Sequence, residues 1–333
     1  MSTSAHQLWF TASHNVEVRQ VSLPVPRPGQ VLVKTHCSAV SAGTELLAYR
    51  GQLPRSIALD SNLASLQETA DYPLQYGYAC VGDIQMLGEG VDPALQGRRV
   101  FSFQPHVSHF LASQEQLMLI PDDLPYETAA LLPNMETAVN LVQDGQPLLG
   151  ERVVVLGQGV VGLLVTSVLA RFPLHNLTVV ESLAARQQLA LNMGADAVLS
   201  PEQAAAEIED ADLIFEVSGH PDALDLALGI SGYCSRVVIG SWYGNKSVCV
   251  DLGGAAHRNR LQLITSQVST IAPGLSGRWT KQRRFDTVWE LLRKIEVERL
   301  ISHPTSIQDA SQLYQALHEG EPGIIQALFY YPN

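Results

Sequence analysis

The chain is poor in charge and in cysteine, and its 333 residues contain no long apolar run. Charged residues make up only 16% of the sequence against 46% hydrophobic residues, which argues against extensive disorder and predicts a large buried core. The 21 Lys and Arg residues are outnumbered by 33 Asp and Glu residues, so the net charge is −12. Because proteins that bind nucleic acid neutralise its phosphates with basic residues, we expect no nucleic-acid partner.

The sequence also lacks the signals of membrane insertion and of a zinc lobe. The start, MSTSAHQLWF, has no basic region before an apolar one, so we expect a cytoplasmic protein with no membrane partner. The cysteines show no C-x-x-C spacing, whereas a structural zinc lobe needs four close ligands. We expect reduced and mostly buried thiols at Cys37, Cys80, Cys234 and Cys249.

Short alternating strands, separated by Pro and Gly, are predicted for the first part of the chain. They fall at 30–40, 98–103, 109–113 and 116–121. Regular short strands with such breaks favour a β-rich barrel or sandwich. The polar stretch 52–72 is expected to form a surface loop with a helical turn.

From residue 127 the pattern changes to alternating helices and strands. A helical pattern at 127–145 precedes ERVVVLG, which is too apolar for a half-exposed strand and indicates a buried parallel strand. The alternation continues to 261–270, which is expected to be one more strand, and two helices and a strand follow. This order predicts an α/β fold with a doubly wound parallel sheet of the Rossmann type.

A dinucleotide-binding fingerprint lies between the first of these strands and its helix. Gly157, Gly159 and Gly162 have G-x-G-x-x-G spacing, in which the glycines allow a tight turn, a close approach to pyrophosphate and helix packing. The intervening residues Gln158, Val160 and Val161 complete the predicted loop. A Rossmann fold that binds S-adenosylmethionine or a nucleotide sugar is the alternative, although such chains usually lack a β-rich domain in front.

Residues at other strand ends extend this predicted cofactor site. Glu181, at the end of LTVVE, would accept ribose hydroxyls and repel a 2′-phosphate, which favours NAD(H) over NADP(H), although nearby Arg186 weakens that preference. Ligands bind at the carboxyl ends of parallel strands, so EVSG and IGSWYG are expected to line the nicotinamide half. The candidates there are Ser218, Gly219, Gly240, Ser241 and Trp242, with packing as the alternative role of the indole.

These features together resemble the medium-chain dehydrogenase/reductase superfamily of zinc alcohol dehydrogenases and quinone reductases. The resemblance spans nearly the whole chain, through QVLVKTHCSAVSAGTELLAYRG, YGYACVG, LPNMETAVNLV and VVVLGQGVVGLL. It implies a GroES-like catalytic domain over 1–126, a Rossmann NAD(P)-binding domain over 127–272 and a return segment over 273–333 that completes the first domain. It also implies a homodimer, through the edge strand at 261–270.

The chain departs from the zinc members of this superfamily at each ligand position. The C-G-T-D-like loop is S-A-G-T-E, which places Ser41 or Ala42 at the Cys position, and the Gly-His-Glu turn has Tyr78 in place of His. The third ligand would fall at 133–134, which is Pro-Asn. Because a catalytic zinc needs three protein ligands, we predict no zinc.

Without a metal, another group must polarise the substrate oxygen. The candidate catalytic residues are Thr44, Tyr78, Glu45 and His106. Thr44 matches the family's proton-relaying hydroxyl; Tyr78 is either a hydrogen-bond donor or a ring that fills the former zinc position. Glu45 is expected to be an ion-pair partner, for example of Arg50, and His106 is either a structural histidine or an acid–base group.

The sequence thus predicts a zinc-independent NAD(P)(H)-dependent oxidoreductase. Its small-molecule substrate would be an alcohol, a carbonyl or an activated double bond. The alternative is a non-catalytic NAD(P)(H)-binding sensor that kept the fold. A basic cluster at Arg278, Lys281, Arg283 and Arg284 is interpreted as a solvated helix face, with contact to an anionic group as the alternative.

Overall fold

The computed structural model describes residues 3–54 and 71–331 and divides into two compact units. Unit 1 comprises residues 1–133 and 296–333, and unit 2 comprises residues 134–295. The divisions come later in the chain than the boundaries expected at 126/127 and 272/273. The polar stretch predicted as a loop at 52–72 lies almost wholly outside the described residues.

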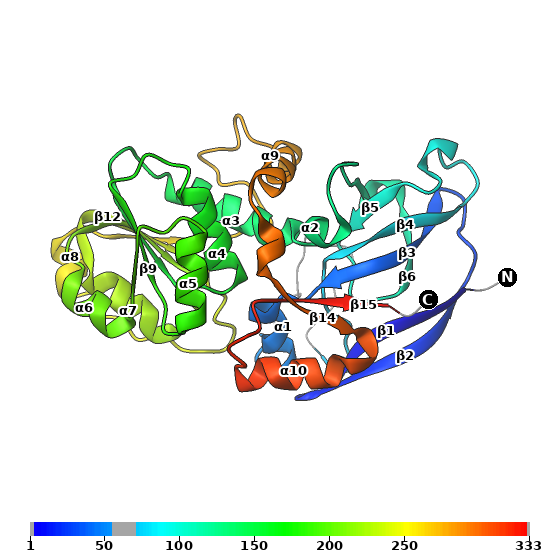
Figure 1. Cartoon of the computed structure of the whole chain (residues 1–333), viewed down its shortest axis with the longest axis horizontal. Helices are drawn as coiled ribbons and strands as arrows, with labels where there is room; N and C mark the ends of the chain where they lie inside the picture. Colours follow the sequence, from blue (N-terminus) through cyan, green and yellow to red (C-terminus); the bar gives the residue numbers. More distant parts are fainter. Residues whose placement is uncertain (1–2, 55–70, 332–333) are drawn as a thin grey trace. The chain divides into compact units, whose positions relative to one another are not determined.

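Unit 1 is built mainly on antiparallel strands, with β14 and β15 as a parallel pair. Its described strands form a two-stranded pair β1–β2 and a seven-stranded sheet in the order β14-β15-β3-β4-β5-β7, with β6 pairing to β3 (Figure 1). The strands are β1 (Thr3–Ala12), β2 (Asn15–Leu23), β3 (Gln30–Ala39), β4 (Cys80–Leu87), β5 (Arg99–Ser102), β6 (His109–Ser113), β7 (Met118–Leu119), β14 (Ile301–Ser306) and β15 (Gln326–Tyr330). Strand β15 pairs with β3 and with β14, so the last part of the chain completes a sheet begun near the first.

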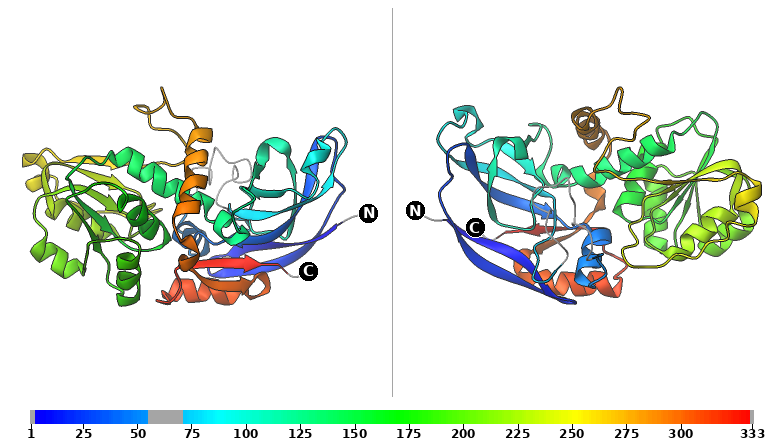
Figure 2. Two further views of the ribbon diagram at one scale, coloured as in Figure 1. Left: turned by 45° about the horizontal axis from the view of Figure 1, so that its top comes forward. Right: turned by 180° about the vertical axis from the view of Figure 1, so that it is seen from behind.

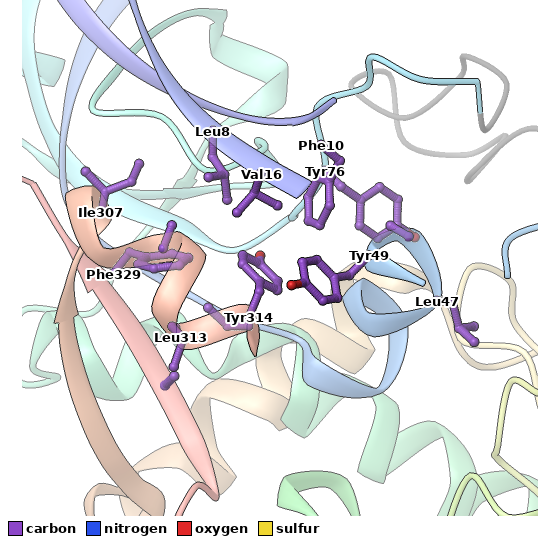
Figure 3. Packing of buried hydrophobic residues seen from close by; sticks show 14 of the residues in the cluster. Leu8, Phe10, Val16, Leu47, Tyr49, Tyr76, Ile307, Leu313, Tyr314 and Phe329 are labelled. Atoms are coloured by element: carbon purple, nitrogen blue, oxygen red, sulfur yellow. The ribbon is translucent and has the colours of Figure 1, made fainter. Parts of the chain in front are cut away.

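Short helices and 3-10 turns close unit 1. They are α1 (Ala42–Tyr49), η2 (Pro93–Leu95), η3 (Gln114–Gln116), α2 (Tyr126–Ala130), η4 (Val297–Leu300), η5 (Ile307–Asp309) and α10 (Ala310–Glu319). Helix α10 buries Ala310, Leu313 and Tyr314, spaced three and four residues apart, on one face, and it ends at Gly320 in the left-handed conformation. Figure 3 shows Tyr314 beside Tyr49 of α1, and their stacked rings are 5.6 Å apart.

Unit 2 is a parallel sheet covered on both faces. Its described strands follow the order β10-β9-β8-β11-β12-β13, and every neighbouring pair is parallel. The strands are β8 (Arg152–Leu156), β9 (Asn176–Val180), β10 (Ala197–Leu199), β11 (Ala211–Glu216), β12 (Ser231–Ile239) and β13 (Gln262–Thr265). The helices are α3 (Leu132–Gly145), α4 (Val160–Leu169), α5 (Ala184–Asn192), α6 (Pro201–Glu207), α7 (Pro221–Gly229), α8 (Ala255–Arg258) and α9 (Lys281–Lys294). Figure 2 shows helices on both sides of this sheet, which confirms the predicted doubly wound fold.

The close packing of α3 on unit 2's sheet follows from two glycines. A Cβ on Gly145 would lie 2.6 Å from the Phe215 ring, and one on Gly240 would lie 2.6 Å from the Leu141 side chain. Side chains at these positions would push the helix off the strands. The edge strand β13 spans four residues, fewer than the ten predicted at 261–270, because the chain turns away after Thr265.

The interpretation of the basic cluster as a solvated face is wrong for one member. Arg284 of α9 is fully buried and donates to Glu136 Oε1 at 3.0 Å, to the Asn140 side chain and to the Thr270 carbonyl at 3.1 Å. Lys281 contacts the same Glu136 carboxylate at 2.5 Å. A buried guanidinium needs such partners, and these bonds fix α9 and the 268–270 segment to α3.

Candidate active site

The glycine loop of unit 2 is shaped by contacts that only glycine allows. Gly157 follows β8 with φ of +92°, and a Cβ there would lie 2.5 Å from the Ser218 Cα. A Cβ on Gly162 would lie 2.0 Å from the Gly157 carbonyl oxygen, so the first turn of α4 rests directly on the loop. These two glycines are therefore required by the protein's own packing.

Gly159 differs from Gly157 and Gly162 because no atom of the described residues lies near the position of a side chain there. It is the N-cap of α4, and within residues 3–54 and 71–331 nothing lies within 4 Å of the place where its Cβ would be. Val160 and Val161 open the helix behind it, with N–H groups that have no partner inside the helix. Open space at a helix N-terminus is what a pyrophosphate requires, so the loop fits a dinucleotide.

Glu181, which follows β9, is fixed by backbone N–H groups. Its Oε2 accepts from Gln158 N at 2.8 Å, and its Oε1 accepts from Ser182 N at 2.8 Å and Leu183 N at 3.0 Å. The Gln158 side chain is buried and supports the loop, donating to the Gly157 carbonyl at 2.9 Å. Glu181 Oε2 keeps acceptor capacity beyond this single bond, which suits a ribose hydroxyl. Arg186, on α5, is partly buried.

The strand ends of β11 and β12 are held together by Glu216, a residue that the sequence did not single out. Its buried carboxylate accepts from Ser218 N at 2.8 Å and from the Tyr243 hydroxyl at 2.5 Å. Burial, and then the Glu216 carboxylate, raise the pKa of Tyr243. The Ser241 hydroxyl accepts from Gly219 N at 2.8 Å, whereas Trp242 is exposed. The structure therefore places Ser218 against Gly157 of the glycine loop, with Ser241 hydrogen-bonded to Gly219 and Gly240 hydrogen-bonded to the Glu216 carbonyl.

Three hydroxyl groups gather in unit 1, and two of them, those of Ser41 and Tyr78, belong to residues compared above with zinc ligands. The Tyr78 hydroxyl donates to Ser41 Oγ and lies 3.4 Å from Thr44 Oγ1. All three residues are partly exposed. Ser41 is the N-cap of α1, yet its side chain makes no capping bond, so its oxygen is free to accept from Tyr78. From the sequence, Ser41 is expected only as a residue that stands at the Cys-ligand position of the zinc members, with no role in a hydroxyl cluster.

Glu45 and His106 form a fully buried pair next to this cluster. Glu45 Oε2 lies 3.0 Å from His106 Nε2, and Glu45 Oε1 accepts from Ser41 N at 2.7 Å. The prediction of an ion pair between Glu45 and Arg50 is wrong, since Arg50 instead donates to His318 Nδ1 at 2.9 Å. Neither Glu45 nor His106 has any exposed surface. The groups that reach the surface are Ser41, Thr44 and Tyr78.

This donor set does not fit a zinc ion. Among the described residues, no group of three or more His, Cys, Asp and Glu side chains is arranged to hold a metal. Protein zinc sites use thiolate, imidazole and carboxylate ligands, whereas Ser41, Thr44 and Tyr78 offer neutral hydroxyls. Two of the four cysteines, Cys37 and Cys80, are buried, and burial raises the pKa of Cys80 to about 12. The other two, Cys234 and Cys249, are exposed, which corrects the expectation of mostly buried thiols.

Comparison with known proteins places these observations in context. D-guloside 3-dehydrogenase of Escherichia coli K12 is 26% identical over 316 residues, covering 88% of this chain and 90% of that protein. (R,R)-butanediol dehydrogenase of Bacillus subtilis is 27% identical over 260 residues, covering 68% of this chain and 74% of that protein. No family model matches the sequence.

Solved structures share the fold across the whole chain. The structure of 2R,3R-butanediol dehydrogenase from Bacillus subtilis has a TM-score of 0.81 at 21% identity, covering 99% of this chain and 100% of that one. The short chain alcohol dehydrogenase rspB of Escherichia coli CFT073, in complex with NADH, has a TM-score of 0.78 at 19% identity, covering 98% and 99%.

The fold and the relatives together define an alcohol dehydrogenase-like oxidoreductase. More closely, these relatives support the resemblance to the medium-chain dehydrogenase/reductase superfamily that the glycine fingerprint and the β-rich N-terminal part predicted. Among the described residues, no helix is both long and apolar enough to cross a membrane.

Proposed function

We propose that this protein is a zinc-independent, NAD(P)(H)-dependent oxidoreductase in which a hydroxyl cluster replaces the metal. Its small-molecule substrate would be an alcohol and the matching carbonyl, or an activated double bond. The observation that carries the proposal is the hydrogen bonding of Tyr78 to Ser41 and Thr44, since the resemblance assigns the positions of Tyr78 and Ser41 to zinc ligands in the zinc members of the family. The relatives named above are dehydrogenases, which supports hydride transfer as the reaction class.

The residues of unit 2 would hold the cofactor. The loop at Gly159 and the N-terminus of α4 suit the pyrophosphate, and Glu181 suits the ribose hydroxyls, so NAD(H) is favoured over NADP(H). Ser218 and Ser241 are proposed to contact the nicotinamide half. The bound cofactor supplies or accepts the hydride, which the side chains of this protein cannot do.

The residues of unit 1 would handle the substrate oxygen. Reduction of a carbonyl places one proton on that oxygen, and Tyr78 is proposed to donate it, with Thr44 as a second hydrogen-bond donor. Water would then restore the Tyr78 proton through Ser41, whose oxygen takes a proton from solvent as it passes its own to the Tyr78 oxygen, since the two oxygens are already hydrogen-bonded and Ser41 is partly exposed. In the oxidative direction the same groups would take the proton in reverse order.

The substitution Tyr78→Phe tests this proposal. It removes the phenol oxygen and keeps the ring, so packing is preserved while the donor is lost. A positioned general acid contributes roughly 10²- to 10⁴-fold, and we expect kcat to fall by that range with the Kd for NADH unchanged. The matched control is Tyr126→Phe, which removes a hydroxyl bonded to Asp83 at 2.6 Å in the same unit and is expected to leave turnover intact.

Substrate screening with NADH and NADPH over ketones, quinones and enones should include a chelator throughout. Activity that disappears on chelation would refute zinc independence. Unchanged turnover of Tyr78→Phe would leave the ring as a space-filling group only. Tight NADH binding without any turnover would support the alternative, a cofactor-binding sensor. We further propose a cytoplasmic homodimer, since β13 lies at the sheet edge and Leu263 on it is 40% exposed.

A further inference from the structure

The hydroxyl pair Tyr78–Ser41 is mounted on a buried polar network that begins at Ser41. As the N-cap of α1, a serine usually accepts an N–H bond through its own side chain, but Ser41 makes no such bond. Its backbone N–H instead donates to Glu45 Oε1 at 2.7 Å. Glu45 therefore fixes the Ser41 backbone and leaves the serine oxygen to accept from Tyr78.

Glu45 is itself held by groups from distant parts of unit 1. Its Oε2 accepts from the Tyr314 hydroxyl of α10 and lies 3.0 Å from His106 Nε2. Burial, and then the Glu45 charge, raise the pKa of Tyr314, which therefore remains a donor. A carboxylate with three hydrogen-bond partners and no exposed surface has one fixed orientation.

His106 connects this carboxylate to the segment that carries Tyr78. Its Nδ1 lies 2.7 Å from Ser38 Oγ, which in turn lies 2.6 Å from the Tyr331 hydroxyl. Its ring lies directly against Gly77, where a Cβ would come within 2.8 Å, and its backbone N–H donates to the Tyr76 carbonyl at 3.2 Å. The two residues before Tyr78 are thus packed against His106.

We infer that Glu45 and His106 are positioning residues that hold both members of the Tyr78–Ser41 pair in one geometry. Glu45 holds Ser41, His106 holds the turn before Tyr78, and the two are hydrogen-bonded to each other. They do not touch substrate, because both are fully buried. This inference rests on the proposed function, in which the Tyr78 hydroxyl donates the proton.

A double-mutant cycle between Glu45 and Tyr78 tests the inference. Glu45→Ala frees the Ser41 backbone, and since a misplacement of about 1 Å costs about 10²-fold, kcat should fall by about that factor. Glu45→Gln keeps an acceptor of the same shape but loses the charge, so kcat should fall only about tenfold. Both losses should disappear when Tyr78 is already Phe, because there is no longer a hydroxyl to align.

The matched control is Glu127→Gln. Glu127 also has a tyrosine and a histidine as partners, with the Tyr330 hydroxyl at 3.0 Å and His36 Nε2 at 3.5 Å, but it has no bond to Ser41. Its kcat should equal that of the wild type. The Kd for NADH should be unchanged in every variant, since the glycine loop lies in unit 2. If Glu45→Ala does not fold, the double-mutant cycle of Glu45→Gln with Tyr78→Phe tests the inference alone.

The outcomes separate this inference from the proposed function. If Tyr78→Phe retains full turnover, the proposed proton donor is wrong and the positioning role falls with it. Suppose that Tyr78→Phe lowers kcat and that each Glu45 substitution lowers kcat by the same factor in the Tyr78→Phe background as in the wild type. The proposed function then stands, and the positioning role is refuted. Wild-type kcat in Glu45→Gln and Glu45→Ala refutes it equally.

Discussion

Replacing glycine by alanine should have opposite effects at Gly159 and Gly162, although the two positions are only three residues apart. In Gly162→Ala, the new methyl group would lie 2.0 Å from the Gly157 carbonyl oxygen, far inside the ~3.5 Å of ordinary carbon contact. Helix α4 must then shift from β8, and such overpacking costs about 1–3 kcal/mol of stability. We therefore expect Gly162→Ala to lower the unfolding midpoint in urea even when no cofactor is present.

Gly159→Ala should leave the stability of the fold almost unchanged and weaken cofactor binding. Among the residues that the structure describes, no atom lies within 4 Å of the new methyl group, and the φ of −69° is open to alanine. Only the N-cap preference is then lost, at about 1 kcal/mol or less. The methyl group would occupy the space assigned to the pyrophosphate. The Kd for NADH should then rise at least tenfold, which is about 1.4 kcal/mol.

Urea unfolding followed by circular dichroism, with and without NADH, separates the two effects. With NADH at about 100 times its Kd, the wild type should gain about 2.7 kcal/mol, and Gly159→Ala at the same NADH concentration should gain much less. Titration of NADH fluorescence gives the Kd values directly. The reasoning is refuted if Gly159→Ala keeps the full gain from NADH, or if Gly162→Ala is as stable as the wild type.

Two further predictions concern thiols and pH. Iodoacetamide at pH about 8, near the ordinary thiol pKa, should label Cys234 and Cys249 but not Cys37 or Cys80 in the native protein; mass spectrometry showing rapid labelling of a buried thiol would contradict the burial described above. Burial raises the pKa of Asp144 and outweighs the lowering of that pKa by its hydrogen-bonding and charged neighbours. The folded state therefore holds the Asp144 proton more tightly than the unfolded chain does, and the stability that this proton contributes is lost as pH rises through the folded pKa. Asp144→Asn should therefore become more stable relative to the wild type between pH about 4 and 7, in thermal unfolding curves, and a constant difference would exclude this linkage.

The cofactor half of the site could be predicted from sequence because its signals are local. Gly157, Gly159 and Gly162 lie within six residues, directly between a buried strand and a helix, and Glu181 ends the next strand. Each part of that pattern has a backbone cause that the structure shows, such as the positive φ of Gly157. Glu216 escaped notice because its partner Tyr243 is 27 residues away, beyond the reach of a short motif.

The unit 1 cluster could be predicted only as a set of candidates. Its bonds join residues 61 and 269 positions apart, as in Glu45 with His106 and Glu45 with Tyr314, and no periodicity reports such pairings. The β1–β2 hairpin was not predicted either. Its turn contains His14 with φ of +61°. Tight hairpin turns are usually recognised in a sequence by Asn-Gly or Asp-Gly, and this turn has neither.

The return of the chain into unit 1 has a consequence for synthesis. Ser38 and Tyr331 are hydrogen-bonded although 293 residues separate them, and Leu328 of β15 pairs with Ala39 of β3. At about 5–20 residues per second, β3 therefore leaves the ribosome roughly 15–60 s before its partner strand exists. Unit 2 is continuous and can fold during that interval. A nascent chain would thus form its nucleotide fold first, and the network beneath the hydroxyl cluster would be complete only after β15 and Tyr331 have been synthesised.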